Sequence, residues 1–191
     1  MEKYLCLILF FLCKFHFVNA QKDTSNIYSN EQASGYYANL DSAIKNSEKV
    51  YYLDLTHIDA SQLLLDLYKF KNLERLQIYS CDIESIPDNI GELKNLEWID
   101  LSFNNLKTLP STVGMLEKLK FLDLSHNKIV QLPDFIYELK GLETLSLSEN
   151  SINFIERRKI RRKFKGRDIS IVFKERKKRK KHAFEDSSKY K

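Results

Sequence analysis

The chain of 191 residues is about one domain long, with 43% hydrophobic residues and a formal net charge of +5 at pH 7. This charge is uneven, because residues 156–191 hold 17 Lys and Arg against 5 Asp and Glu, which leaves the rest of the chain mildly acidic. The five glycines do not cluster, and this excludes a glycine-rich phosphate-binding loop.

Residues 1–20 are predicted to be a secretory signal peptide. A short charged start precedes an apolar run from Tyr4 to Cys13, and Ala20 offers a small residue at a cleavage point. The alternative is a membrane anchor, but a run of about 10 residues is roughly half of what spans a bilayer, and Lys14 and His16 interrupt the apolar character beyond it. We therefore expect export (periplasmic or secreted), cleavage near Ala20 and no transmembrane segment in the mature chain.

Residues 21–49 are predicted to form a polar leader followed by a capping helix. The leader, residues 21–35, is rich in polar side chains. Within residues 36–49, Leu40 and Ile44 have helical spacing and strand alternation is absent. A helix here would cover the N-terminal end of the adjoining repeats, because the end of a repeat array needs a cap.

Residues 50–155 are predicted to be built from repeats. Segments of 23 residues start at Val50, Leu73, Leu96, Leu119 and Leu142. Apolar residues recur at offsets 0, 3, 5, 10 and 13 of nearly every segment. The pair at offsets 3 and 5 has a period of two, so both side chains point to one face of a strand. Each connection is too long for a hairpin, so successive strands must be parallel and must stack into a sheet.

This pattern resembles the leucine-rich repeat family, with its L-x-x-L-x-L-x-x-N/C-x-L motif. The pairs Ile86-Pro87, Leu109-Pro110 and Leu132-Pro133 are similar to the "LPxxIxxL" side of the 23-residue type. The resemblance implies an α/β fold: a right-handed solenoid with a parallel β-sheet on its concave face, five repeats plus a terminal strand, and a helical N-terminal cap. The absence of cysteine-stapled caps resembles short secreted bacterial members more than secreted eukaryotic ones.

Offset 8 ends each strand, and the resemblance implies that its side chains form a ladder of bonds to the backbone inside the turns. The ladder residues are Cys81, Asn104, Asn127 and Asn150, whereas Ile58 breaks the ladder in the first repeat. Cys81 is the one cysteine left after cleavage, so no intrachain disulfide can form. We interpret it as a buried structural thiol rather than a reactive one.

Offsets 2, 4 and 6 are predicted to face outward from the sheet. Offsets 4 and 6 mostly match the family consensus, but the family leaves offset 2 free. Large side chains fill it here, with Tyr79 beside them at offset 6: Tyr52, Arg75, Trp98 and Phe121. Binding hot spots favour aromatic residues and Arg, so this column predicts a contact site for a protein or peptide. The alternative is that cross-strand aromatic neighbours only stabilise the sheet.

Residues 156–173 are predicted to cap the C-terminal end. Apolar residues at helical spacing indicate a basic amphipathic helix that stops at Gly166: Ile152, Ile155, Ile160 and Phe164. A terminal strand comes next. Ile169 and Ile171 come 24 residues after Leu145 and Leu147, so we expect these residues to pair and to close the sheet.

Residues 174–191 are predicted to be a basic disordered tail, since seven of the eight residues from Lys174 to Lys181 are basic. The functional alternative is attraction to an anionic surface: lipid headgroups, a polyanionic glycan or nucleic acid. The residues for it would be Arg157, Arg158, Arg161, Arg162, Lys174, Lys177, Lys178, Lys180 and Lys181. No aromatic residues are interleaved for base stacking, so sequence-specific nucleic-acid binding is not expected.

No catalytic or metal-binding constellation is indicated by the pattern. Asp123 and Ser125 are about 7 Å apart along one strand, and His126 should turn away. His57 and His126 lie three coils, or roughly 14 Å, apart, too far to share a zinc ion. We therefore expect a monomeric, non-enzymatic binding module without a cofactor, with a protein or peptide partner. The rival hypothesis, an adsorber to anionic surfaces, differs in that its binding should weaken steeply with salt.

Overall fold

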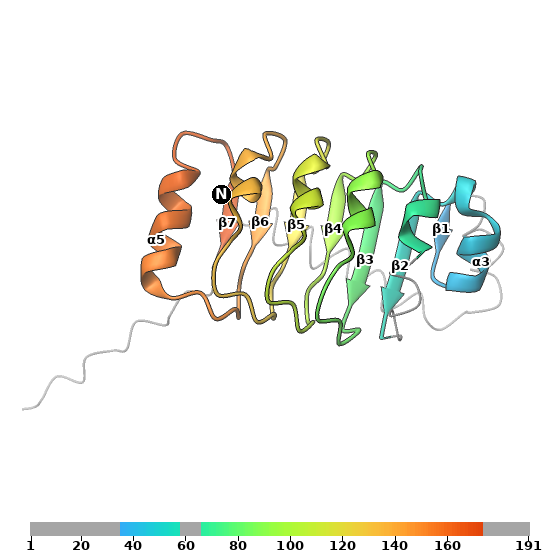
Figure 1. Ribbon diagram of the computed structural model, residues 1–191, viewed down its shortest axis with the longest axis horizontal. Coiled ribbons are helices and arrows are strands. Elements are labelled where there is room, and N and C mark those ends of the chain that lie inside the picture. The colour runs from blue at the N-terminus through green and yellow to red at the C-terminus, as the bar shows by residue number, and fades with distance from the viewer. Residues whose placement is uncertain (1–34, 58–65, 174–191) are drawn as a thin grey trace, which may run out of the picture.

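The strands stack in chain order into one parallel sheet (Figure 1). The computed structural model describes residues 35–57 and 66–173. The strands of this part of the chain are β1 (Tyr36–Tyr37), β2 (Tyr52–Thr56), β3 (Arg75–Tyr79), β4 (Trp98–Asp100), β5 (Phe121–Asp123), β6 (Thr144–Ser146) and β7 (Ser170–Val172). Each pairs with its neighbours in the chain, because every repeat returns the backbone beside the preceding coil.

The register of the sheet follows the 23-residue period. Leu53 pairs with Leu76, which pairs with Ile99, and the row continues through Leu122 and Leu145. Each of these side chains is at most 1% exposed, and so are the offset-5 residues Leu101 and Leu124. The inward rows form one continuous core along the stack. The predicted leucine-rich repeat fold class is therefore confirmed.

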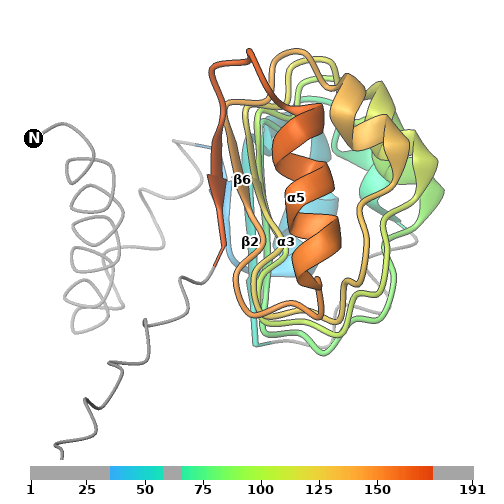
Figure 2. The same ribbon diagram turned by 90° about the vertical axis from the view of Figure 1, so that its left-hand side faces the viewer.

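Short 3-10 helices cover the opposite side of the core (Figure 2). They are η3 (Leu67–Lys69), η4 (Asp88–Glu92), η5 (Ser111–Met115) and η6 (Asp134–Glu138). Proline precedes the last three, where a missing N–H costs no helical bond. Its carbonyl accepts the first bond of the turn, as in the 3.2 Å contact from the Ile90 N–H to the Pro87 oxygen. The Ile-Pro and Leu-Pro pairs thus start a helical turn in each of these three coils.

The N-terminal end consists of β1, α3 (Leu40–Lys45) and η2 (Ser47–Lys49). Asn39 caps α3, accepting a 3.0 Å bond from the Ser42 N–H, and the helix buries Ala43. The expected helix over residues 36–49 is therefore much shorter, and β1 was not expected. The strand forms because Tyr36 and Tyr37 pair with Tyr52 and Leu53, so the sheet gains a strand beyond the first repeat.

The C-terminal end is covered by α5 (Phe154–Lys163), which lies across the last coil (Figure 2). The expectation that Ile155 joins its buried face is wrong, because that side chain is 78% exposed while Ile160 and Phe164 are buried. The expected register of β7 is wrong by two residues. Leu145 pairs with Ile171, and not with Ile169, since the helix and the turn at Gly166 lengthen the connection.

Several predictions lie outside the described residues: the signal peptide at 1–20, most of the polar leader, the ladder break at Ile58 and the tail at 174–191. In the part of the chain that the structure describes, no helix has the length and apolar character needed to cross a membrane.

Candidate binding face of the sheet

The sheet face opposite the short helices, here termed the concave face, carries a row of large side chains at the start of the strands. The row, termed the aromatic column, consists of Tyr36, Tyr52, Arg75, Trp98 and Phe121, which are register partners from β1 to β5. The rings of Trp98 and Phe121 stack, with centroids 5.1 Å apart and planes 8° apart. Tyr52 meets Tyr36 edge-on at 4.9 Å. The structure thus adds Tyr36 to the predicted residues.

The column has an exposed cation within a row of partly buried rings. Arg75 is exposed on β3, between Tyr52 and Trp98. Those two rings still meet edge-on across it, at 6.5 Å. Contacts of this kind contribute about 0.5–1.5 kcal/mol beyond area burial. The column therefore helps to hold the sheet together as well as forming part of its surface.

Two residues after the column, at offset 4, each strand from β2 to β6 carries a polar side chain. These side chains were expected to face outward, but several of them are buried. Asp54, Asp100 and Asp123 are 5–7% exposed. Each carboxylate accepts from the residue two positions later. The Thr56 hydroxyl reaches Asp54 at 2.6 Å, the Ser102 N–H and hydroxyl reach Asp100 at 2.8 and 2.5 Å, and the Ser125 N–H reaches Asp123 at 2.8 Å. These carboxylates are therefore buried acceptors bonded within the sheet, and they add little to its exposed surface.

A second aromatic group, termed the edge cluster, lies at the far ends of the strands and was missed in the sequence. It contains His57, Tyr79, Phe103 and His126. The Tyr79 ring contacts His57 at 5.6 Å and Phe103 at 5.0 Å, and Phe103 stacks on His126 at 3.9 Å. Phe103 is 42% exposed. Tyr79, predicted beside the aromatic column, therefore belongs to this separate cluster.

The backbone explains how the edge cluster forms. The residue at offset 7 has a positive φ in all five repeats, from 53° to 58°, including Phe103 and His126. This left-handed conformation is costly for a bulky residue and turns its side chain out of the strand alternation. The next coil holds the conformation in place, since the Phe103 N–H donates to the Ser125 oxygen at 3.0 Å. The sequence signal for the edge cluster was that three of the five offset-7 residues have ring side chains: His57, Phe103 and His126.

The offset-8 side chains bond backbone groups of two coils. Asn104 Nδ2 donates to the carbonyls of Ile78, Leu101 and Ser102 at 2.7–3.2 Å, and its oxygen accepts from the Cys81 and Ile83 N–H groups. Asn127 and Asn150 repeat this arrangement one and two coils later. In the same position, Cys81 Sγ donates to the Leu55 carbonyl at 3.0 Å. The ladder fixes the turns from which the edge cluster projects.

The predicted basic residues on α5 have different surroundings. Arg157 donates to the Ile152 carbonyl at 3.0 Å, and the guanidinium groups of Arg157 and Arg161 lie 5.2 and 5.3 Å from the Phe173 ring centroid. Arg158, Arg161 and Arg162 are exposed. The remaining predicted residues, Lys174, Lys177, Lys178, Lys180 and Lys181, lie outside the described residues.

The geometry offers no nucleophile with an adjacent base at the motif considered in the sequence. Ser125 donates its backbone N–H to Asp123, while the His126 ring stacks on Phe103 instead of approaching the serine. Among residues 35–57 and 66–173, no group of three or more His, Cys, Asp or Glu side chains is placed to hold a metal ion. The concave face offers rings and one exposed cation, which is chemistry for binding.

Comparisons with solved structures find similar proteins. A leucine-rich repeat protein of Leptospira interrogans is 34% identical, with a TM-score of 0.54, over 65% of this chain and 30% of that one. Internalin C2 of Listeria monocytogenes is 16% identical, with a TM-score of 0.53, over 72% of this chain and 66% of that one. A plant peptide hormone receptor, solved in complex with RGF2, is 26% identical, with a TM-score of 0.50, over 60% of this chain and 19% of that one.

This chain therefore spans less than a third of the Leptospira protein and of the plant receptor. A search of curated proteins finds no match. The model of the leucine-rich repeat region matches residues 42–189, well over half of the chain. Repeat proteins of this kind commonly present their extended face as a protein-interaction scaffold. Together with the parallel sheet and its offset-8 ladder, the match shows that the chain belongs to the leucine-rich repeat family.

Proposed function

We propose that this protein is an exported, non-enzymatic binding module whose concave face takes a peptide segment of a protein partner. The observation that carries the proposal is the aromatic column, in which stacked Trp98 and Phe121 lie beside exposed Arg75. Trp, Tyr and Arg are the residues that dominate binding hot spots. Export rests on the signal-like pattern of residues 1–20, with cleavage near Ala20.

The size of the surface favours a peptide over a broad globular contact. Offset 7 lies in the turn five residues after offset 2, at most about 16 Å away, and β1 to β5 span four strand spacings, about 19 Å. The resulting area of roughly 300 Å² is well below the about 800 Å² that each partner buries in a standard interface. An extended segment of about five or six residues has the length of the column.

Two further facts support a peptide partner. The backbone on the concave face is already paired within the sheet, so a ligand must be held by side chains, and the rings of the column are pre-positioned by contacts with each other. The similar plant protein is a peptide hormone receptor, although this chain covers 19% of it. We extend peptide binding, and not the identity of the peptide, to this protein.

A random peptide library displayed on phage and selected on the exported protein would test the proposal. Trp98 is the only tryptophan of the chain, so its fluorescence reports directly on occupancy of the column. Selected peptides should shift this emission, and their affinity should be largely independent of salt. The proposal is wrong if the selected peptides leave Trp98 emission unchanged and are displaced by salt, which is the behaviour of the rival anionic-surface hypothesis.

A matched pair of variants makes this test specific. Trp98→Ala should weaken binding of the selected peptides at least about 30-fold, the loss expected for a central anchor. Tyr68→Ala removes a ring of η3, on the opposite side of the core, and should leave binding unchanged, although that ring, at 41%, is more exposed than Trp98. Equal effects of the two substitutions would place the peptide site elsewhere.

A further inference from the structure

The first turn of α5 exposes two adjacent apolar side chains. Phe154 is 74% and Ile155 is 78% exposed, and both exceed every other large hydrophobic side chain identified as exposed in the described residues. Asn153 caps the helix by accepting a 2.9 Å bond from the Glu156 N–H, so this turn is ordered by its own sequence. The aromatic column and the peptide site do not involve these residues.

The helix periodicity separates the two faces of α5. Ile160 and Phe164 point into the core, and the inward face also includes partly buried Arg157 and Glu156. Glu156 is the single acid of the helix, and Lys159 lies 3.5 Å from it. Helical geometry places Arg158 and Arg162 on the side opposite Ile160, next to Phe154 and Ile155. The outward face therefore combines two apolar residues with cations and no unpaired acid.

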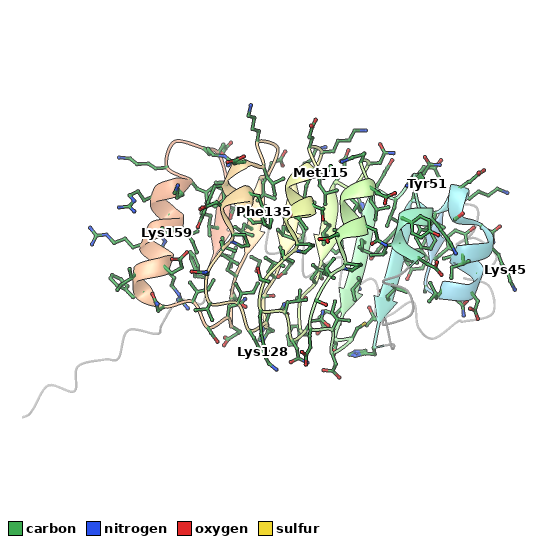
Figure 3. The ribbon with its side chains drawn as sticks, viewed as in Figure 1. Lys45, Tyr51, Met115, Lys128, Phe135 and Lys159 are labelled. Atoms are coloured by element: carbon green, nitrogen blue, oxygen red, sulfur yellow. The ribbon has the colours of Figure 1, made fainter. Side chains whose placement is uncertain are left out.

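The position of α5 makes this face available. The helix forms the outer end of the solenoid, and Lys159 projects there, at the opposite end from Lys45 on α3 (Figure 3). The described part of the chain ends at Phe173, whose ring contacts the guanidinium groups of Arg157 and Arg161. The next eight residues in the sequence include seven Lys and Arg. Positive charge thus continues from α5 into the adjoining sequence.

We propose that the outward face of α5 docks on an anionic lipid bilayer, with Phe154 and Ile155 entering the headgroup–acyl boundary and Arg158 and Arg162 contacting lipid phosphates. Interfacial helices combine apolar insertion with basic residues in this way, and each signal alone gives weak, reversible binding. Nucleic acid or a sulfated glycan would satisfy the arginines but would leave Ile155 without a partner. The apolar pair is thus the observation that selects lipid among anionic surfaces.

Vesicle co-sedimentation tests this inference. The protein is recovered from an exporting host, and N-terminal sequencing confirms that the wild type and all variants begin at the same residue. The wild type should bind vesicles of equal parts phosphatidylcholine and phosphatidylglycerol, but not vesicles of phosphatidylcholine alone. The double substitution Phe154→Ser/Ile155→Ser should lower partitioning about tenfold or more. The pair Arg158→Gln/Arg162→Gln should also lower it about tenfold, and high salt should remove the remaining binding.

Matched controls come from exposed residues of the same kinds elsewhere on the protein. Met115 and Val130 are 51% and 55% exposed, away from α5, so Met115→Ser/Val130→Ser should leave vesicle binding unchanged. Lys107→Gln/Lys128→Gln removes the same charge as the arginine pair from another surface and should also have no effect. If the control pairs lower binding as much as the α5 pairs, adsorption is diffuse and the proposal is wrong.

Two further outcomes would overturn the proposal. If Phe154→Ser/Ile155→Ser binds vesicles like the wild type, or weakens heparin binding as strongly as vesicle binding, the apolar pair has no lipid-specific role. If the wild type instead elutes as an oligomer in size-exclusion chromatography and this variant elutes as a monomer, the pair contacts a second copy of the chain. Peptide binding, followed by Trp98 fluorescence, should be unchanged in the α5 variants. Failure of the lipid proposal can therefore be distinguished from failure of the proposed peptide binding.

Discussion

The interior coils and the C-terminal cap use different side chains to bond backbone carbonyls. In the interior, the neutral amide of Asn104 donates to three carbonyls and is 6% exposed. At the cap, the guanidinium of Arg167 donates to the carbonyls of Tyr137, at 2.8 Å, and Leu139, and it remains partly exposed. Both side chains donate to backbone carbonyls, but only the second carries a charge.

This difference arises from the surroundings of each coil. An interior side chain is enclosed by the next coil, where a buried charge would need a compensating partner. At the end of the stack water remains on one side, so a guanidinium can bond carbonyls and stay hydrated. Arg157 does the same at the Ile152 carbonyl. The residues that complete the cap thus also contribute to the positive charge of this end of the molecule.

The largest expected effect belongs to the interior core. Leu124 is 0% exposed, and Leu124→Ala should lower the free energy of unfolding by about 2–5 kcal/mol through lost transfer energy and the cavity left behind. Urea denaturation measures the loss. Val130→Ala, on a side chain that is 55% exposed, should change stability little. A loss of less than about 0.5 kcal/mol for Leu124→Ala would show that the strand register is wrong.

The comparison between coil and cap predicts unequal losses for the two donors. Asn104→Ala removes the amide donor to the buried Ile78 carbonyl and the acceptor of two backbone N–H groups, and should cost about 3 kcal/mol. Arg167→Ala should cost about 1 kcal/mol, because water can reach the carbonyls it releases. Denaturant unfolding of both variants measures the difference. Equal losses would contradict the claim that enclosure by the next coil distinguishes the two sites.

A smaller effect is expected where the last repeat meets the cap. Tyr137 packs against Phe164 at 5.2 Å, and its buried hydroxyl has no hydrogen-bond partner among the described residues. Burial raises the pKa of Tyr137 to about 12. Because this folded pKa exceeds the unfolded value, near 10, the tyrosine's contribution to stability is complete below pH 10 and is lost as the pH rises toward 12.

Tyr137→Phe should therefore be neutral at pH 7, or more stable by up to about 1 kcal/mol, because it removes an unsatisfied hydroxyl. Between pH 10 and 12 its free energy of unfolding should fall less steeply than that of the wild type. Tyr68→Phe, which removes the same hydroxyl from an exposed ring of η3, serves as the control substitution. A substitution that costs stability at pH 7 would show that the hydroxyl has a partner.

The repeat period was sufficient to predict the interior from the sequence. Every pairing from β2 to β6 joins residues 23 apart, as in Leu76 with Ile99, because identical coils must stack in identical register. The ends could not be predicted in the same way. Tyr36 and Tyr37 form a strand too short to show alternation, and the position of Ile171 depends on the length of the α5 connection.

The exposure and contacts of surface side chains depend on local backbone geometry, which the repeat pattern does not specify. Ile155 fits a spacing of apolar residues, but it is five positions before Ile160, and this rotates it far from the buried face of α5. His126 was expected to turn away from the strand, and Phe103 was not considered. Their positive φ brings the rings together instead. Backbone conformation at offset 7 is a property of the folded turn, and composition does not reveal it.

The most direct test of the central claim is the affinity of a selected peptide for Trp98→Ala, with the free energy of unfolding measured on the same sample. The expected result is a loss of at least about 30-fold in affinity together with a stability loss of only about 2 kcal/mol, the value of the two aromatic contacts that Trp98 makes with Tyr52 and Phe121. Retained affinity, or a stability loss of about 3–5 kcal/mol as for a buried tryptophan, would show that the aromatic column is structural.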